Sequence, residues 1–176
     1  MPTIHVCPLS QIPATVRVSG ARSLLTLINE GTTVPRPLEI EEHRHLFVAM
    51  SDIVAAEDGH ILPAQAHVQQ VLDFVRQWDG EDALVIHCFA GVSRSTAAAF
   101  IAACALDEQR SEHEIAQEVR RRSKTATPNK LMVEIADRLL DRHGRMVAAV
   151  EAIGRGADCY EGEPFCLDLD AVRRAA

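Results

Sequence analysis

The sequence lacks an excess of basic residues, a long apolar run and a leader-like N-terminus. The formal net charge is -7, so no overall positive field would attract nucleic acid. The longest unbroken apolar run, Ala97 to Leu106, is shorter than the roughly 20 residues that a membrane span needs. The first residues contain no charged stretch followed by an apolar one, so no signal peptide is expected. We therefore expect no nucleic-acid partner and no membrane span.

Cysteine is also too sparse for a disulfide framework. The five cysteines are an odd number and lie far apart: Cys7, Cys88, Cys104, Cys159 and Cys166. Without a signal peptide, this pattern favours a reducing, cytoplasmic compartment, in which a catalytic thiolate would also stay reduced. His43, His45 and His60 have no recognisable metal-ligand spacing, so we expect no metal and no other cofactor.

The chain contains no internal repeat and no linker that would divide it into domains. An apolar content of 47% is typical of a globular domain rather than of a disordered chain. We predict one domain over residues 1–176, with an acidic, poorly patterned C-terminal extension at about residues 154–176.

The apolar pattern predicts an alternation of strands and helices. Apolar, β-capable segments predict strands at residues 3–7, 23–28, 45–50 and 84–86. Periodicity, alanine content and capping residues predict helices over residues 64–78, from Arg94 through Ala103, after the capping box Ser111–Glu114, from Thr127 to near Gly144, and over residues 145–153. This order favours an α/β fold with a central, largely parallel, twisted sheet flanked by helices. Functional residues are then expected at the carboxyl edge of the sheet.

Residues 83–95, which read ALVIHCFAGVSRS, stand out at one such edge. The run Leu84 to Ile86 is typical of a strand that is buried on both faces. The helix predicted from Arg94 follows after a short loop that contains Gly91. A strand, a tight loop and a helix N-terminus in this order form an anion site, because loop N–H groups and the helix dipole favour negative charge there.

Two residues make this anion site a candidate for chemistry. Cys88 lies where the strand ends, and the loop N–H groups, the helix dipole and a guanidinium would favour its thiolate over its thiol. Arg94 follows six positions later, and its planar fork matches two oxygens of a phosphate, which a lysine could not do. The spacing therefore predicts a nucleophile beside a bound phosphate group.

The segment HCFAGVSRS resembles the phosphate-binding loop of the cysteine-dependent protein tyrosine phosphatases, whose pattern is H-C-x5-R followed by Ser or Thr. The flanking sequence is most similar to the small dual-specificity branch. The resemblance implies the phosphotyrosine-phosphatase-like fold, and hydrolysis of phosphomonoesters on protein side chains through a phosphocysteine intermediate. The implied partners are a phosphorylated protein or peptide, and phosphate, sulfate or vanadate in the loop. The residues expected to bind the substrate phosphate are Phe89, Ala90, Gly91, Val92, Ser93 and Arg94.

Two neighbours of the nucleophile are also expected to act in catalysis. Ser95 Oγ can form a hydrogen bond with the sulfur of Cys88, which would stabilise the thiolate both as nucleophile and as leaving group. His87 can orient the loop through its own hydrogen bonds. A core histidine without a role in the chemistry stays open as the alternative for His87.

The leaving oxygen of the substrate needs a proton, so a carboxylic acid is expected above the pocket. Asp52 follows a predicted strand and begins a mobile loop, and the general acid of the resembled family lies in such a loop. Glu57 and Asp58 are the alternatives. Asn129 matches a Pro-Asn pair that the family often carries, and we interpret it as a structural residue that bonds the loop region.

Some features of the family are absent. No Trp-Pro-Asp triplet marks the acid loop, and no tyrosine-bearing motif for a deep pocket lies near the N-terminus. The choice between phosphotyrosine and phosphoserine or phosphothreonine therefore stays open. Residues Phe89 to Ser93 contain no lysine, which disfavours a multiply charged inositol phosphate. A phosphoinositide phosphatase and a phosphoprotein-binding module without turnover remain the alternative functions.

Overall fold

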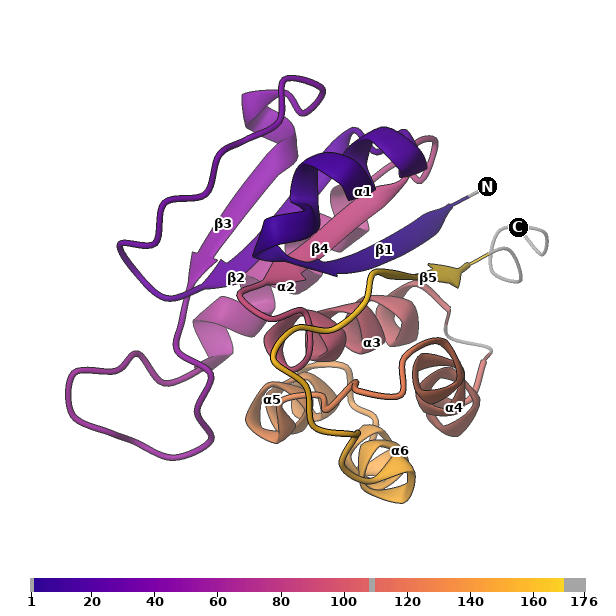
Figure 1. Ribbon diagram of the computed structural model, residues 1–176. Coiled ribbons are helices and arrows are strands. Elements are labelled where there is room, and N and C mark those ends of the chain that lie inside the picture. The colour runs from indigo at the N-terminus through magenta and orange to yellow at the C-terminus, as the bar shows by residue number, and fades with distance from the viewer. Residues whose placement is uncertain (1, 108–109, 170–176) are drawn as a thin grey trace.

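The computed structural model describes residues 2–107 and 110–169 of the chain. Its centre is a five-stranded sheet in the order β3-β2-β4-β1-β5 (Figure 1). The strands are β1 (Thr3–Pro8), β2 (Ser23–Ile28), β3 (His45–Ala49), β4 (Leu84–Cys88) and β5 (Phe165–Asp168). The helices are α1 (Ile12–Ser19), α2 (Gln65–Gln77), α3 (Arg94–Leu106), α4 (Glu112–Arg122), α5 (Lys130–Leu139) and α6 (Arg145–Ile153). Two 3-10 turns lie at Leu9–Gln11 and Glu42–Arg44.

The sheet is parallel except at one edge. The pairs β1–β4, β4–β2 and β2–β3 are parallel, and β5 runs antiparallel to β1. The register pairs Pro8 with Cys88 and Thr26 with His87. Because parallel strands end at the same edge, the residues that follow β1, β2 and β4 gather around Cys88.

Helices cover both faces of the sheet, and side chains alternate between two apolar cores. Val85 of β4 packs in the core beneath α1, with Ile12 and Val16. Its neighbours Leu84 and Ile86 pack in the larger core on the opposite face, formed with α2 to α6 (Figure 1). Helix α3 is buried from Arg94 through Cys104, so it is fixed by packing on every side. Both elements that flank the loop after Cys88 are therefore rigid.

The α/β fold with a largely parallel sheet is confirmed, and each of the four predicted strands is present. The predicted capping box is also confirmed: Ser111 Oγ accepts a hydrogen bond from the Glu114 amide (3.3 Å), and the Glu114 carboxylate accepts one from the Ser111 amide (3.2 Å). Among the helices of the described ranges, none combines the length and the apolar character that crossing a bilayer requires.

Three elements differ from the sequence prediction. Helix α1 was not predicted, and strand β5 lies inside the segment interpreted as a poorly patterned extension. Helix α5 begins at Lys130 rather than at Thr127. The cause of that shift is Asn129, whose side-chain oxygen accepts a hydrogen bond from the Met132 amide (3.1 Å) and so forms the N-cap.

Candidate active site

The loop between β4 and α3, residues 88–94, is a narrow turn that only glycine permits at its apex. Gly91 has a φ of 70°, in the left-handed region. A Cβ added to Gly91 would lie 2.7 Å from the backbone nitrogen of Pro8 and 2.8 Å from the carbonyl carbon of Cys7. The loop therefore packs directly on the end of β1, and its backbone can approach a ligand without an intervening side chain.

Four carbonyl groups of this loop point outward. Each of the four accepts a hydrogen bond from a backbone amide outside the loop: Phe89 from Leu9 (3.1 Å), Ala90 from Gly162 (2.8 Å), Val92 from Thr127 (2.9 Å) and Ser93 from Ala97 (2.9 Å). Because a trans peptide directs its N–H opposite to its C=O, the following amides point toward the interior of the loop. Within the described part of the chain, the amides of Phe89 to Ser93 donate no hydrogen bond. The result is a ring of free donors that suits an oxyanion.

Cys88 lies at the base of this ring. The residue is only 2% exposed, at the carboxyl end of β4. Its sulfur is 3.1 Å from the hydroxyl oxygen of Ser95, in the first turn of α3. If the sulfur is a thiolate, the hydroxyl is the donor of this hydrogen bond and stabilises the negative charge.

Arg94 is held from one side and leaves the other side for a ligand. The buried guanidinium donates through Nη1 to the side-chain oxygen of Asn29 (2.6 Å) and to the carbonyl oxygen of Met50 (2.7 Å). Nε of Arg94 is the one fully buried side-chain nitrogen or oxygen that has no partner among the described residues. Buried polar atoms are nearly always satisfied, so this orphan donor indicates a missing acceptor. The edge formed by Nε and Nη2 fits two oxygens of a phosphate.

His87 is fully buried and joins a chain of hydrogen bonds that ends at Cys88. Its Nδ1 lies 3.1 Å from the Cys88 carbonyl oxygen and must donate, because a carbonyl only accepts. Its Nε2 therefore accepts from the Thr26 hydroxyl (2.7 Å), which in turn accepts from Nε2 of His45 (2.8 Å). Burial lowers the pKa of His87 to about 4, so this ring is neutral near neutral pH and fixes the backbone at Cys88.

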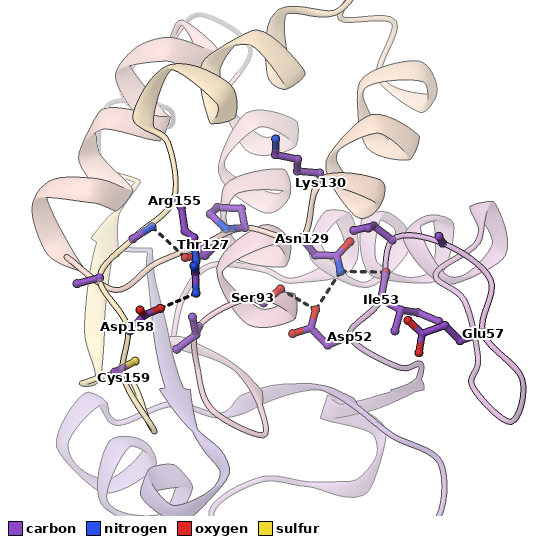
Figure 2. A pocket seen from close by; sticks show the side chains of 16 residues that line it. Asp52, Ile53, Glu57, Ser93, Thr127, Asn129, Lys130, Arg155, Asp158 and Cys159 are labelled. Carbon is purple, nitrogen blue, oxygen red and sulfur yellow. Dashed lines mark hydrogen bonds and ion pairs between the residues drawn. The ribbon is translucent and has the colours of Figure 1, made fainter.

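Asp52 lies at the rim of the loop, where two side chains orient it. Its Oδ1 accepts hydrogen bonds from Ser93 Oγ (2.6 Å) and from Asn129 Nδ2 (2.9 Å), as Figure 2 shows. The side-chain amide of Asn129 also donates to the carbonyl oxygen of Ile53 (3.2 Å), which holds the start of the loop that begins at Asp52, called the acid loop below. Both donors bind the same carboxylate oxygen, so Oδ2 is left for a proton. Neither Glu57 nor Asp58 has a hydrogen bond to the loop within the described ranges.

A groove of about 560 Å³ adjoins the loop on the side of Asp52. Its walls come from the acid loop, the start of α5 and the segment that follows α6, with Arg155 and Asp158 facing Asp52 and Glu57 across it (Figure 2). Ser93 lies between the two walls, so the groove is continuous with the loop between β4 and α3. Arg155 and Asp158 are paired with each other at 2.5 Å.

The structure brings together Cys88, Arg94, Ser95, His87 and Asp52, the predicted catalytic residues. Sequence reasoning missed Asn29, Thr26 and Gly162, which contact Arg94, His87 and Ala90. Asn29 directly follows β2, so the rule that functional residues gather at carboxyl strand ends could have identified it. No sequence signal marks Gly162, since its contact depends on a strand that the pattern does not predict.

The fold is an α/β sandwich, and a loop with free amide donors lies at the carboxyl edge of its parallel strands. No protein-family model and no curated protein matches the sequence. Among solved structures, human DUSP28 is 16% identical, with a TM-score of 0.61 over 86% of this chain and 96% of that one. The PTP-2 phosphatase of Cydia pomonella is 20% identical, with a TM-score of 0.59 over 76% of this chain and 83% of that one.

A third similar structure is that of PTPMT1 in complex with PI(5)P, which is 14% identical, with a TM-score of 0.59 over 81% of this chain and 96% of that one. The chain therefore has the fold of the cysteine-dependent protein tyrosine phosphatases and dual-specificity phosphatases.

Proposed function

We propose that this protein hydrolyses phosphomonoesters on protein side chains through a phosphocysteine intermediate. The single observation that carries the proposal is the unpaired, buried Nε of Arg94 beside a ring of free loop amides and the sulfur of Cys88. Such a site binds a tetrahedral oxyanion and holds a nucleophile against it. The thiolate requires a reducing setting, for which we propose the cytoplasm.

In the first step the thiolate of Cys88 attacks phosphorus in line with the leaving oxygen. The sulfur–phosphorus bond forms as the phosphorus–oxygen bond breaks, while the amides of residues 89–94 and the free edge of Arg94 bind the three other oxygens. Asp52 gives its proton from Oδ2 to the leaving oxygen. In the second step Asp52 takes a proton from water, which attacks phosphorus and releases Cys88 as a thiolate stabilised by Ser95.

Replacing Asp52 with Asn should lower kcat by about 10²-fold on a phosphothreonine peptide, because an alkoxide is a poor leaving group without a proton. The fall should be much smaller on p-nitrophenyl phosphate, whose leaving group departs without protonation. The side-chain oxygen of Asn can still accept from Ser93 and Asn129, so the loop should stay in place. Steady-state kinetics on both substrates measures the difference.

Glu57→Gln and Asp58→Asn are the matched controls for this experiment. Both carboxylates lie in the same loop without a hydrogen bond to residues 88–94 in the described ranges, and both variants should keep wild-type kcat. A loss in either control with full activity in Asp52→Asn would assign the general acid to the other residue.

The groove beside the loop favours a protein substrate over a lipid. It extends the phosphate site sideways by about 560 Å³, enough for side chains that flank a phosphorylated residue. Residues Phe89 to Ser93 carry no lysine, and the net charge of -7 opposes an anionic membrane surface. The complex of PTPMT1 with PI(5)P makes a phosphoinositide the second candidate substrate. Phosphate release from phosphotyrosine peptide, phosphothreonine peptide and PI(5)P vesicles separates these classes.

A binding module without turnover is the remaining alternative. It would keep the anion site but would not need an oriented acid, whereas Asp52 accepts two hydrogen bonds at the rim of the loop. Turnover of p-nitrophenyl phosphate that vanadate inhibits would support the enzyme. Tight binding of a phosphopeptide without phosphate release would support the module.

A further inference from the structure

The segment between α6 and β5, residues 154–164, contacts the outer side of the catalytic loop, and we call it the strap. In Figure 1 it runs from α6 past α3 to the edge of the sheet. The buried Gly162 donates its amide to the carbonyl oxygen of Ala90 at 2.8 Å. A Cβ added to Gly162 would lie 3.1 Å from the carbonyl oxygen of Gly91. The strap therefore contacts the two residues at the apex of the loop.

This contact determines where one of the anion-binding donors points. The carbonyl of Ala90 and the N–H of Gly91 belong to one planar trans peptide and point in opposite directions. Because the amide of Gly162 holds that carbonyl on the outside, the N–H of Gly91 is directed to the inside. A shift of the strap would rotate this peptide and misdirect the donor.

The opposite side of the apex is equally constrained. Gly91 packs on the backbone of Cys7 and Pro8, and the amide of Leu9 donates to Phe89. The loop is thus held between the end of β1 and the strap. The 3-10 turn that follows β1 is joined directly to the strap, because Ser10 Oγ lies 2.6 Å and 2.9 Å from the two carboxylate oxygens of Glu161.

The strap is also fixed at its beginning. The amide of Gly156 donates to the hydroxyl of Thr127 (3.0 Å), and the amide of Ala157 donates to the carbonyl oxygen of Lys124 (2.9 Å). A Cβ added to Gly156 would lie 2.5 Å from the carbonyl carbon of Thr125, so the two backbones are in direct contact. The strap is therefore anchored before its contact with Ala90, and the pairing of β5 with β1 anchors the chain after it.

We propose that the strap positions the phosphate-binding loop, and that Gly162 is a positioning residue which acts on the N–H of Gly91. This inference rests on the proposed function, since it assigns a role within the same site. It gives the C-terminal extension a part in anion binding, through a contact that neither the loop motif nor the acid loop contains.

The test uses anion affinity, which does not depend on turnover. The concentration of orthophosphate that protects Cys88 from iodoacetate is measured for the full chain and for three variants: Gly162→Ala, Glu161→Ala and Ser10→Ala. Gly162 has no positive φ, so the backbone accepts alanine, but the new Cβ would force the Gly91 carbonyl to move by tenths of an ångström. The protecting concentration should rise about tenfold in Gly162→Ala and about threefold in Glu161→Ala and Ser10→Ala.

Glu163→Ala is the matched control, because Glu163 is exposed on the same strap, two residues from Glu161, and has no partner among the described residues. In Glu163→Ala, the concentration of orthophosphate that protects Cys88 from iodoacetate should equal that of the wild type. Thermal unfolding of each variant separates positioning from stability. A lower Tm with unchanged phosphate protection would overturn the proposal, because it would give the strap a structural role alone. If Gly162→Ala does not fold, the Glu161→Ala and Ser10→Ala variants decide by the same criterion.

The outcomes for the wild-type protein keep the two proposals apart. Protection of Cys88 by phosphate without turnover of any phosphomonoester would contradict the proposed function. The role of the strap in anion binding would still be decided by the phosphate protection of the variants. An absence of protection in the wild type would overturn both, since no anion site would exist for the strap to position.

Discussion

Replacing Cys88 with Ser should lower kcat on p-nitrophenyl phosphate by at least about 10⁴-fold, the size of loss seen when an enzyme loses its nucleophile. A serine hydroxyl stays protonated and has no neighbouring base here, because His87 uses Nδ1 on a backbone carbonyl and Nε2 on Thr26. The side chains are similar in size, so the loop should keep its shape. Phosphate binding should therefore persist while turnover is lost, and equilibrium binding of orthophosphate measures that half of the prediction.

Cys166→Ser is the control for this substitution, because Cys166 lies in β5, outside the loop and the groove. It should retain wild-type kcat. If Cys88→Ser kept more than about a tenth of the activity, the phosphocysteine route would be wrong, and a directly attacking water would have to replace it.

Replacing Arg94 with Lys should lower kcat/KM by about 10³-fold, although the charge is retained. Nη1 is committed to Asn29 and Met50, while Nε and Nη2 are left for the phosphate. A single ammonium cannot satisfy both sets of acceptors, so either the hydrogen bonds to Asn29 and Met50 or the contacts with the phosphate oxygens are lost. The inhibition constant of vanadate should rise as kcat/KM falls, since the oxygens of vanadate bind the same donors as the oxygens of phosphate.

The exposed Arg76 on α2 provides the matched control, because Arg76→Lys changes the same functional groups away from the site. Its kinetic constants should be unchanged. An Arg94→Lys variant within a few-fold of the wild type would show that charge alone suffices, and would contradict the role given to the free guanidinium edge.

The sequence was informative wherever the chemistry is local. The spacing from Cys88 to Arg94 identified the loop, and the position of Asp52 shortly after the strand predicted at residues 45–50 identified the residue that lies at the rim. These features could be predicted because each depends on neighbours within a few residues or on a strand end. The packing of Gly91 against the backbone of Pro8 joins positions far apart in the chain and did not follow from the sequence.

The features that escaped prediction depend on long-range pairing. Strand β5 is a short edge strand with a single partner, and nothing in FCLD specifies that it should pair with β1. The contact from Gly162 to Ala90 follows from that pairing and was missed with it. Helix α1 was missed because Thr15, Val16 and Val18 are β-branched, while the Pro13 that favours its first turn is a weak signal alone.

The two residues that accept hydrogen bonds from Arg94 Nη1 were also not predicted, because these contacts are long-range. Asn29 and Met50 lie 65 and 44 positions from Arg94 along the chain, directly after β2 and β3, and the order of these strands in the sheet could not be derived from periodicity. The predicted start of α5 was wrong by a few residues for a different reason. Asn129 serves both as the N-cap of α5 and as a donor to Asp52, so the contact with Asp52 and the start of the helix depend on the same side chain.

The central claim, that residue 88 carries a reactive sulfur anion within an oxyanion site, is tested most directly by iodoacetate at about pH 6, with mass spectrometry of each cysteine peptide. Burial raises the pKa of Cys7 to about 12 and that of Cys166 to about 11, so both should stay protonated and unreactive, and the exposed Cys159 serves as the reference thiol. Cys88 should be alkylated first, and orthophosphate should block that reaction. Alkylation of Cys159 ahead of Cys88, unchanged by orthophosphate, would contradict the account.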